Sequence, residues 1–139
     1  MSQLITPCTL NCTLCSGLGI YQGAEWSLPI RLSERANGQD TPIDISDYDG
    51  ICCVKKYCGE DTPVASPLVT ITNGANGEFM LSLTAEETAN ILVSGRQYKE
   101  VGVFQYDCYL ISKTTGERFR VLQGNVEVSP TVTDLNDGE

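Results

Sequence analysis

The sequence contains no histidine and few cations, with nine lysine and arginine residues against eighteen aspartate and glutamate residues. Without histidine, the chain lacks the commonest general base, every Ser–His or Cys–His nucleophile pair and every histidine-containing metal site. The formal net charge of −9 repels phosphate backbones, so nucleic acid is not an expected partner. These absences argue against an enzyme and against a nucleic-acid-binding protein.

Long apolar runs are also missing. Uninterrupted apolar runs reach only about four residues, far below the roughly 20 that span a bilayer. The N-terminus has neither the basic region nor the apolar region of a secretory signal. We therefore expect no membrane partner and synthesis in the cytoplasm.

The material that is present suits one small folded domain. The chain has 139 residues, of which 41% are hydrophobic and 19% are charged. This composition supports a single core and excludes a two-domain enzyme, a coiled coil and a disordered chain.

The first 24 residues carry no charged side chain, although they hold three of the seven cysteines. Pro7, Gly17, Gly19 and Gly23 interrupt any helical or strand periodicity. A solvated tail normally carries charge and few aliphatic residues, so residues 1–25 are predicted to form an irregular, cysteine-rich docking arm. We expect this arm to order against a neighbour or through its cysteines. The side chains predicted to dock on a partner are Leu4, Ile5, Leu10, Leu14, Leu18, Ile20 and Tyr21.

From Trp26 onward, the sequence changes to short alternating segments separated by turn residues, which is typical of β-strands. The alternation is clearest at Phe119, Val121, Val126 and Val128, as in a half-buried antiparallel sheet. The pattern predicts strands at residues 28–32, 51–57, 68–72, 78–83, 99–112 and 118–129.

Turn residues predict a loop at residues 37–42 and a hairpin turn at residues 73–77. One helix is expected because Thr84 and Glu87 have the spacing of a capping box, and residues 94–95 would end it after about two turns. Together these elements predict an all-β fold, an antiparallel immunoglobulin-like β-sandwich with one short helix, over residues 26–133. Residues 134–139 are predicted to be an acidic tail.

Two blocks of sequence carry a resemblance to a known family. The first is residues 76–89, NGEFMLSLTAEETA, followed by Gly95 and a tyrosine-containing strand. The second, after Thr115 and Gly116, is residues 121–133, VLQGNVEVSPTVT. Together these blocks resemble small tailed-phage β-sandwich proteins, and in particular the N-terminal docking module of baseplate and fibre-carrier proteins. The resemblance covers roughly residues 26–133 and consists of scaffold residues without a catalytic signature.

The resemblance implies a non-enzymatic structural component of a tailed-phage virion, made in the host cytoplasm. Such a protein would join baseplate, neck or tail-fibre parts through contacts with other virion proteins and with copies of itself. Two alternatives stay open at this point. One is a capsid decoration (cement) protein, and the other is a small secreted binding module stapled by disulfides.

The seven cysteines fall into two clusters and one single position. The first cluster is the triplet Cys8, Cys12 and Cys15, and the second cluster is Cys52, Cys53 and Cys58. Disulfides are the leading interpretation of the clusters, and free buried thiols are an alternative. The single residue, Cys108, alternates with Tyr106 and Leu110 and is therefore expected in the core. Because the count is odd, one thiol must stay free or bond to another subunit. The disulfide candidates are Cys8, Cys12, Cys15, Cys52, Cys53 and Cys58.

A structural zinc or iron–sulfur site is the third interpretation of these cysteines, and no other cofactor is expected. The first triplet would supply three thiolates, and the second cluster, with Cys53 as the candidate, would supply the fourth. Only one C-x2-C pair, Cys12 and Cys15, occurs, so the metal signal is weak.

Three aspartates, Asp44, Asp47 and Asp49, lie close enough in sequence to suggest a calcium loop. Gly50 follows Asp49 directly and no glutamate closes the loop, so these residues do not have the spacing of an EF-hand calcium loop. A solvated turn is the favoured interpretation.

Overall fold

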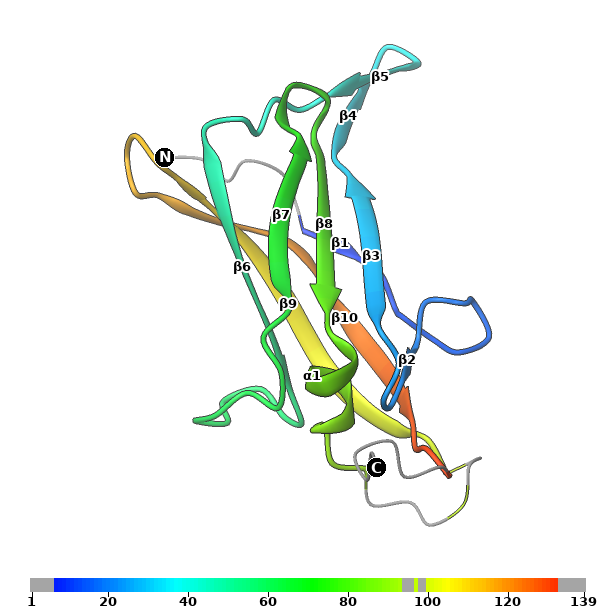
Figure 1. The fold of residues 1–139 in the computed structure, drawn as a ribbon. Coiled ribbons are helices and arrows are strands. Elements are labelled where there is room, and N and C mark those ends of the chain that lie inside the picture. The colour runs from blue at the N-terminus through cyan, green and yellow to red at the C-terminus, as the bar shows by residue number, and fades with distance from the viewer. Residues whose placement is uncertain (1–6, 94–96, 98–99, 133–139) are drawn as a thin grey trace.

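The computed structural model describes residues 7–93, 97 and 100–132, which contain two β-sheets, a small hairpin and one short α-helix (Figure 1). The fold is mostly antiparallel and β-sandwich-like, which confirms the predicted all-β class with a short helix. The strands are β1 (Cys8–Thr9), β2 (Ile20–Tyr21), β3 (Trp26–Arg31), β4 (Ser33–Ala36), β5 (Gln39–Pro42), β6 (Tyr48–Lys55), β7 (Leu68–Asn73), β8 (Glu78–Leu83), β9 (Gly102–Ser112) and β10 (Arg118–Ser129).

The larger sheet has the strand order β1-β10-β9-β6, and β2 pairs with β10 further along the same edge as β1. The smaller sheet has the order β3-β8-β7. Figure 1 shows the long strands β9 and β10 crossing behind β3, β8 and β7. The strand-to-strand hairpins β7–β8 and β9–β10 are local in sequence, so turn residues and alternation were sufficient to predict them.

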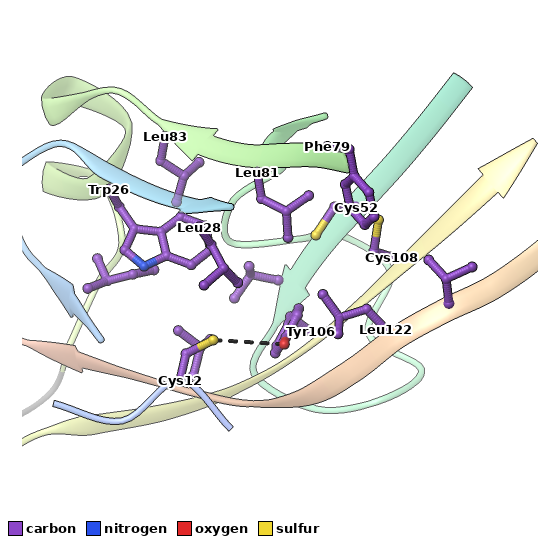
Figure 2. Packing of buried hydrophobic residues seen from close by; sticks show 14 of the residues in the cluster. Cys12, Trp26, Leu28, Cys52, Phe79, Leu81, Leu83, Tyr106, Cys108 and Leu122 are labelled. Carbon is purple, nitrogen blue, oxygen red and sulfur yellow. Dashed lines mark hydrogen bonds between the residues drawn. The ribbon is translucent and has the colours of Figure 1, made fainter. Parts of the chain in front are cut away.

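The core lies between the two sheets, because alternate residues of each strand point inward. On β9 the buried residues include Phe104, Tyr106 and Cys108, and the predicted core position of Cys108 is confirmed at 0% exposure. On β8 the inward residues are Phe79, Leu81 and Leu83 (Figure 2). Each fully buried side chain of this size contributes roughly 1.5–3 kcal/mol.

The helix α1 (Ala85–Ala89) begins with the predicted capping box. Thr84 Oγ1 accepts a hydrogen bond from the Glu87 amide, and Glu87 Oε1 accepts one from the Thr84 amide at 2.8 Å. The helix is shorter than predicted. It ends at Ala89 because the chain turns to bury Ile91, whose amide bonds to the carbonyl of Thr88. The predicted end at residues 94–95 lies outside the described residues.

Residues 37–42 do not form the predicted loop. They belong to a hairpin in which β4 pairs with β5 and which extends beyond the sheets (Figure 1). Asn37 and Gly38 have φ values of 53° and 78°, as the two central positions of a tight hairpin turn require. The prediction was wrong because it assigned this Asn-Gly pair to an irregular loop, whereas the pair forms the turn between two antiparallel strands.

Candidate functional site

The arm lies along the free edge of β10 in a parallel arrangement. Cys8 pairs with Leu122, Cys12 with Val126 and Ile20 with Val128. The amides of Leu10 and Cys12 donate to carbonyls of β10 at 2.9 and 2.8 Å. The arm therefore satisfies an edge that would otherwise present unpaired backbone groups.

One glycine makes this close approach possible. A Cβ atom added at Gly124 would lie 2.2 Å from the backbone oxygen of Leu10. The loop between β1 and β2 is also close to β10, where the Leu14 amide donates to Glu127 Oε1 at 2.9 Å. The arm lacks periodicity because its paired stretches are short and a loop separates them.

Side chains of the arm complete the core. Cys12 and Ile20 are both 0% exposed. The Tyr106 hydroxyl donates to the carbonyl of Leu10 at 2.7 Å, and its burial raises the pKa of that hydroxyl. The Trp26 indole donates to the carbonyl of Leu18 at 2.9 Å, which joins the arm to β3. Residues 7–22 thus fill the space between the edge strands β3 and β10. We call this region the sealed seam.

The predicted docking residues thus have different positions. Ile20 is buried within its own chain, whereas Tyr21 is 53% exposed. Leu10 and Leu18 pack partly buried against the core, and Leu14 is half-buried. Leu4 and Ile5 lie outside the described residues. The docking of these residues on a partner stays a prediction.

All seven cysteines are free thiols in the structure, so the disulfides predicted for the arm are not formed there. The register explains why an arm-to-β6 disulfide is unfavourable. Cys8, Leu122, Cys108 and Cys52 lie in one row across four strands. Three strand spacings are about 14 Å, whereas a disulfide joins Cα atoms closer than about 7 Å. Backbone pairing and burial, and not cross-links, hold the arm here.

The cysteines do not gather as a metal site. Cys8, Cys15 and Cys58 are exposed, Cys53 is half-buried and Cys12 is buried against Tyr106. Among residues 7–93, 97 and 100–132, no three Cys, Asp or Glu side chains are placed to hold a metal ion.

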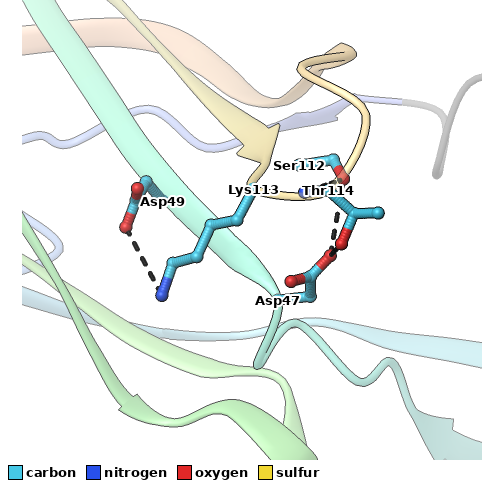
Figure 3. A network of polar contacts seen from close by, with 5 residues as sticks. All are labelled: Asp47, Asp49, Ser112, Lys113 and Thr114. Atoms are coloured by element: carbon cyan, nitrogen blue, oxygen red, sulfur yellow. Dashed lines mark hydrogen bonds and ion pairs between the residues drawn. The ribbon is translucent and has the colours of Figure 1, made fainter.

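The three aspartates near the start of β6 make contacts within turns or to turns, and Figure 3 shows those of Asp47 and Asp49. Asp47 Oδ2 accepts hydrogen bonds from Ser112 and from Thr114, the latter at 2.7 Å. Asp49 lies 3.9 Å from the ammonium of Lys113. Asp44 accepts from the hydroxyl and the amide of Ser46, which lowers the pKa of that carboxyl. Asp47 and Asp49 thus hold the β9–β10 turn against β6, whereas Asp44 bonds only to Ser46, and the three carboxylates do not converge.

A hollow of about 760 Å³ lies on the outer face of the larger sheet. In its lining the Arg120 guanidinium donates to the Tyr109 hydroxyl at 2.7 and 3.0 Å, which raises the pKa of Arg120. Asp107 lies 3.7 Å from the same guanidinium. Amide side chains surround this group and offer donors and acceptors to a polar ligand. The lining residues are Thr9, Asn11, Ile51, Cys53, Lys55, Cys58, Gly59, Gln105, Tyr106, Asp107, Tyr109, Arg120, Gln123, Gly124 and Asn125.

The opening on the other side of the sandwich lies between the edge strands β6 and β7. The strands touch where Gly50 faces Val69, because a Cβ on Gly50 would lie 2.3 Å from a Val69 methyl. Beside this contact lies a hollow of about 460 Å³, which residues of β8 and α1 also line. Ile51 is 52% exposed and Leu68 is 66% exposed at its rim. We call this surface the open seam, and its residues are Gly50, Ile51, Cys52, Ser66, Pro67, Leu68, Val69, Ser82, Thr84 and Glu87.

Sequence reasoning did not identify the open seam. Alternation separates Cys52 and Val54 from Ile51, but it does not tell which strands lie at sheet edges. The signal that was available is the pair of large aliphatic residues, Ile51 and Leu68, at polar-face positions of their strands.

A scan against protein-family models found no match, and a search of curated proteins found no significant similarity to this chain. Within the described residues, no helix has the length and apolar character needed to cross a membrane. The functional assignment therefore rests on the sequence resemblance and on the geometry of the two seams and the outer hollow.

Proposed function

We propose that this protein is a non-enzymatic structural component of a tailed-phage virion, with an immunoglobulin-like sandwich that joins baseplate, neck or tail-fibre parts. The observation that carries the proposal is the open seam. Its two edge strands border a hollow, and Ile51 and Leu68 expose apolar area there. Edge strands with exposed apolar side chains are sites where another chain adds an extended segment.

The opposite side of the same molecule supports this mode of binding. In the sealed seam, an extended segment contributes backbone hydrogen bonds to β10 and buries Cys12 and Ile20. A segment from a neighbouring virion protein would occupy the open seam in a comparable way. Glu87 lines this seam and the chain carries a net charge of −9, so an apolar segment with basic flanks suits it best.

Two variants test the proposal in virions produced with the altered protein. Ile51→Lys and Leu68→Lys place a charge at exposed positions of the open seam, and both proteins should stay folded. We expect at least a tenfold loss of incorporation, measured by mass spectrometry of purified particles. Leu92→Lys is the matched control, because Leu92 is 84% exposed and does not line the seam.

Two outcomes contradict different parts of the proposal. If the unaltered protein is missing from purified virions, the virion function is wrong. If both lysine variants incorporate normally, the open seam is not the docking site, and the protein binds its virion partner through another surface. Immunogold labelling separates the tail from the capsid, and a signal over the head would favour the decoration alternative.

The outer hollow favours a second function, that of a small binding module for a polar ligand. Its volume of about 760 Å³ lies within the range of small-molecule sites. The amides around Arg120 and Tyr109 suit a neutral oligosaccharide, which needs paired donors and acceptors. Saturable oligosaccharide binding that is lost in Arg120→Ala would favour this function. The virion proposal predicts no such binding.

A further inference from the structure

Cys52 on β6 and Cys108 on β9 are direct partners across the two strands. The amide of Val54 donates to Ala65, and the carbonyl of Val54 accepts from Val64, so both groups of Val54 turn away from β9. Backbone direction repeats every second residue along a strand, so Cys52 also turns its backbone groups away from β9. Cys52 and Cys108 are therefore a non-hydrogen-bonded pair, in which facing side chains lie closest.

This position fits the geometry of a disulfide. Facing Cα atoms in non-hydrogen-bonded pairs are about 4.5 Å apart, at the short end of the range that disulfides span. Both side chains point into the core, with exposures of 2% for Cys52 and 0% for Cys108. The two sulfur atoms lie next to each other in Figure 2. A hydrogen bond to Cys108 and burial together raise the pKa of Cys52, so Cys52 is a thiol at neutral pH.

Of these two residues, Cys52 lies against the open seam, which is the side from which a small molecule would reach it. Cys52 is among the residues that line the hollow of about 460 Å³ between β6 and β7. The other cysteines have no facing cysteine in the paired strands. Cys53, the neighbour of Cys52, pairs with Asp107 and points to the outer face, where it lines the larger hollow.

We propose that Cys52 and Cys108 form a redox modification site, at which a low-molecular-weight disulfide converts the thiol pair into an intrachain disulfide that joins β6 to β9. This inference is independent of the proposed virion function. It also differs from the pairings that the sequence suggested, because it pairs a clustered cysteine with the isolated one.

The chemistry is two successive thiol–disulfide exchanges. The Cys52 thiolate attacks one sulfur of the reagent, forms a mixed disulfide and releases one reagent thiol. The Cys108 thiolate then attacks the Cys52 sulfur, forms the Cys52–Cys108 bond and releases the second reagent thiol. Overall, two protein thiols are oxidised and one reagent disulfide is reduced to two thiols. Because the raised pKa of Cys52 limits its thiolate, the rate should increase as pH rises.

The test uses the full-length protein and glutathione disulfide as the oxidant. After incubation, the protein is denatured without reductant, free thiols are alkylated, and peptides are mapped by mass spectrometry. We expect a cross-linked Cys52–Cys108 peptide and the loss of both residues from the alkylated set. Cys8, Cys15 and Cys58 are exposed and should carry separable glutathione adducts.

Variants separate this pair from its neighbours. Cys53→Ser should leave the cross-link unchanged, because Cys53 points to the opposite face of the sheet. Cys108→Ala should abolish it and leave Cys52 alkylated or glutathionylated. The wild-type map does not depend on how a variant folds. Full alkylation of Cys52 and Cys108 in that map, or a Cys52 cross-link to any other cysteine, would overturn the proposal.

Discussion

Each of the two seams lies at edge strands of the sheets, and the seams differ in what covers those edges. In the sealed seam, the protein's own arm pairs with β10 and buries Cys12 and Ile20. In the open seam, β6 and β7 meet at Gly50 and Val69, and a hollow with Ile51 and Leu68 exposed at it lies beside this contact. An edge strand must be covered or blunted to avoid unwanted pairing. The edge covered by the arm thus contributes to the stability of the fold, and the other edge is the one that we propose as the docking site for a partner.

The largest expected effect breaks the sealed seam. Ile20→Ala removes a fully buried side chain and should lower the free energy of unfolding by about 2–5 kcal/mol. Urea denaturation followed by circular dichroism measures this change. Tyr21→Ala is the matched neighbour, and with 53% exposure it should cost less than about 1 kcal/mol. Equal costs at both positions would show that the arm does not belong to the core.

The second-largest expected effect is a stabilisation of the fold by a cross-link beside the open seam. The oxidised Cys52–Cys108 pair would join β6, the edge strand of that seam, to β9 in the centre of the sheet. It should raise the free energy of unfolding by about 2–4 kcal/mol, because a long loop of the unfolded chain is closed. The measurement compares urea midpoints of the oxidised and reduced protein, with Cys108→Ala as the variant that should show no difference. An oxidised protein less stable than the reduced one would mean that native strain exceeds this gain.

A smaller effect loosens the arm without removing a core side chain. Gly124→Ala places a methyl group 2.2 Å from the Leu10 oxygen, so the arm or β10 must shift, at a cost of about 1–3 kcal/mol. Hydrogen exchange should then increase at the amides of Leu10 and Cys12, which bond to β10. Asn125→Ala, at an exposed neighbouring residue, is the control. Unchanged exchange at both arm amides would contradict the close contact described here.

The smallest effect concerns the open seam itself. Leu68→Lys should change the free energy of unfolding by less than about 0.5 kcal/mol, because the side chain is 66% exposed and lysine is common on natural edge strands. A cost comparable to that of Ile20→Ala would show that Leu68 is part of the folded core and would remove the contrast between the seams. The same variant in virions then reports on binding alone.

Part of the fold was predictable because it depends on neighbours in sequence. The alternation in residues 118–129 predicts a strand with the boundaries of β10, and the spacing of Thr84 and Glu87 predicts the capped start of α1. The core position of Cys108 follows from the same alternation. In each case, the deciding contacts are made within a few residues or on one face of one strand.

Which cysteines face each other could not be predicted from the sequence. Their spacing suggested links within clusters and between the arm and residues 52–58, yet the sheet places β1 and β6 at opposite edges. The facing of Cys52 and Cys108 depends on the register between β6 and β9, which no spacing in the sequence specifies. A one-residue shift of that register would pair Cys108 with a residue on the other face.

The sequence by itself determined the strand-rich class, the hairpins, the helix cap and an arm too apolar for a solvated tail, because these properties are local or compositional. Only the tertiary structure decided that the arm pairs with its own β10, where Leu14 and Glu127 meet across 113 positions of the chain. It also decided that β6 and β7 form the edges of the open seam. Such contacts form when distant segments exclude water together, and the free energy gained belongs to the pair rather than to either segment.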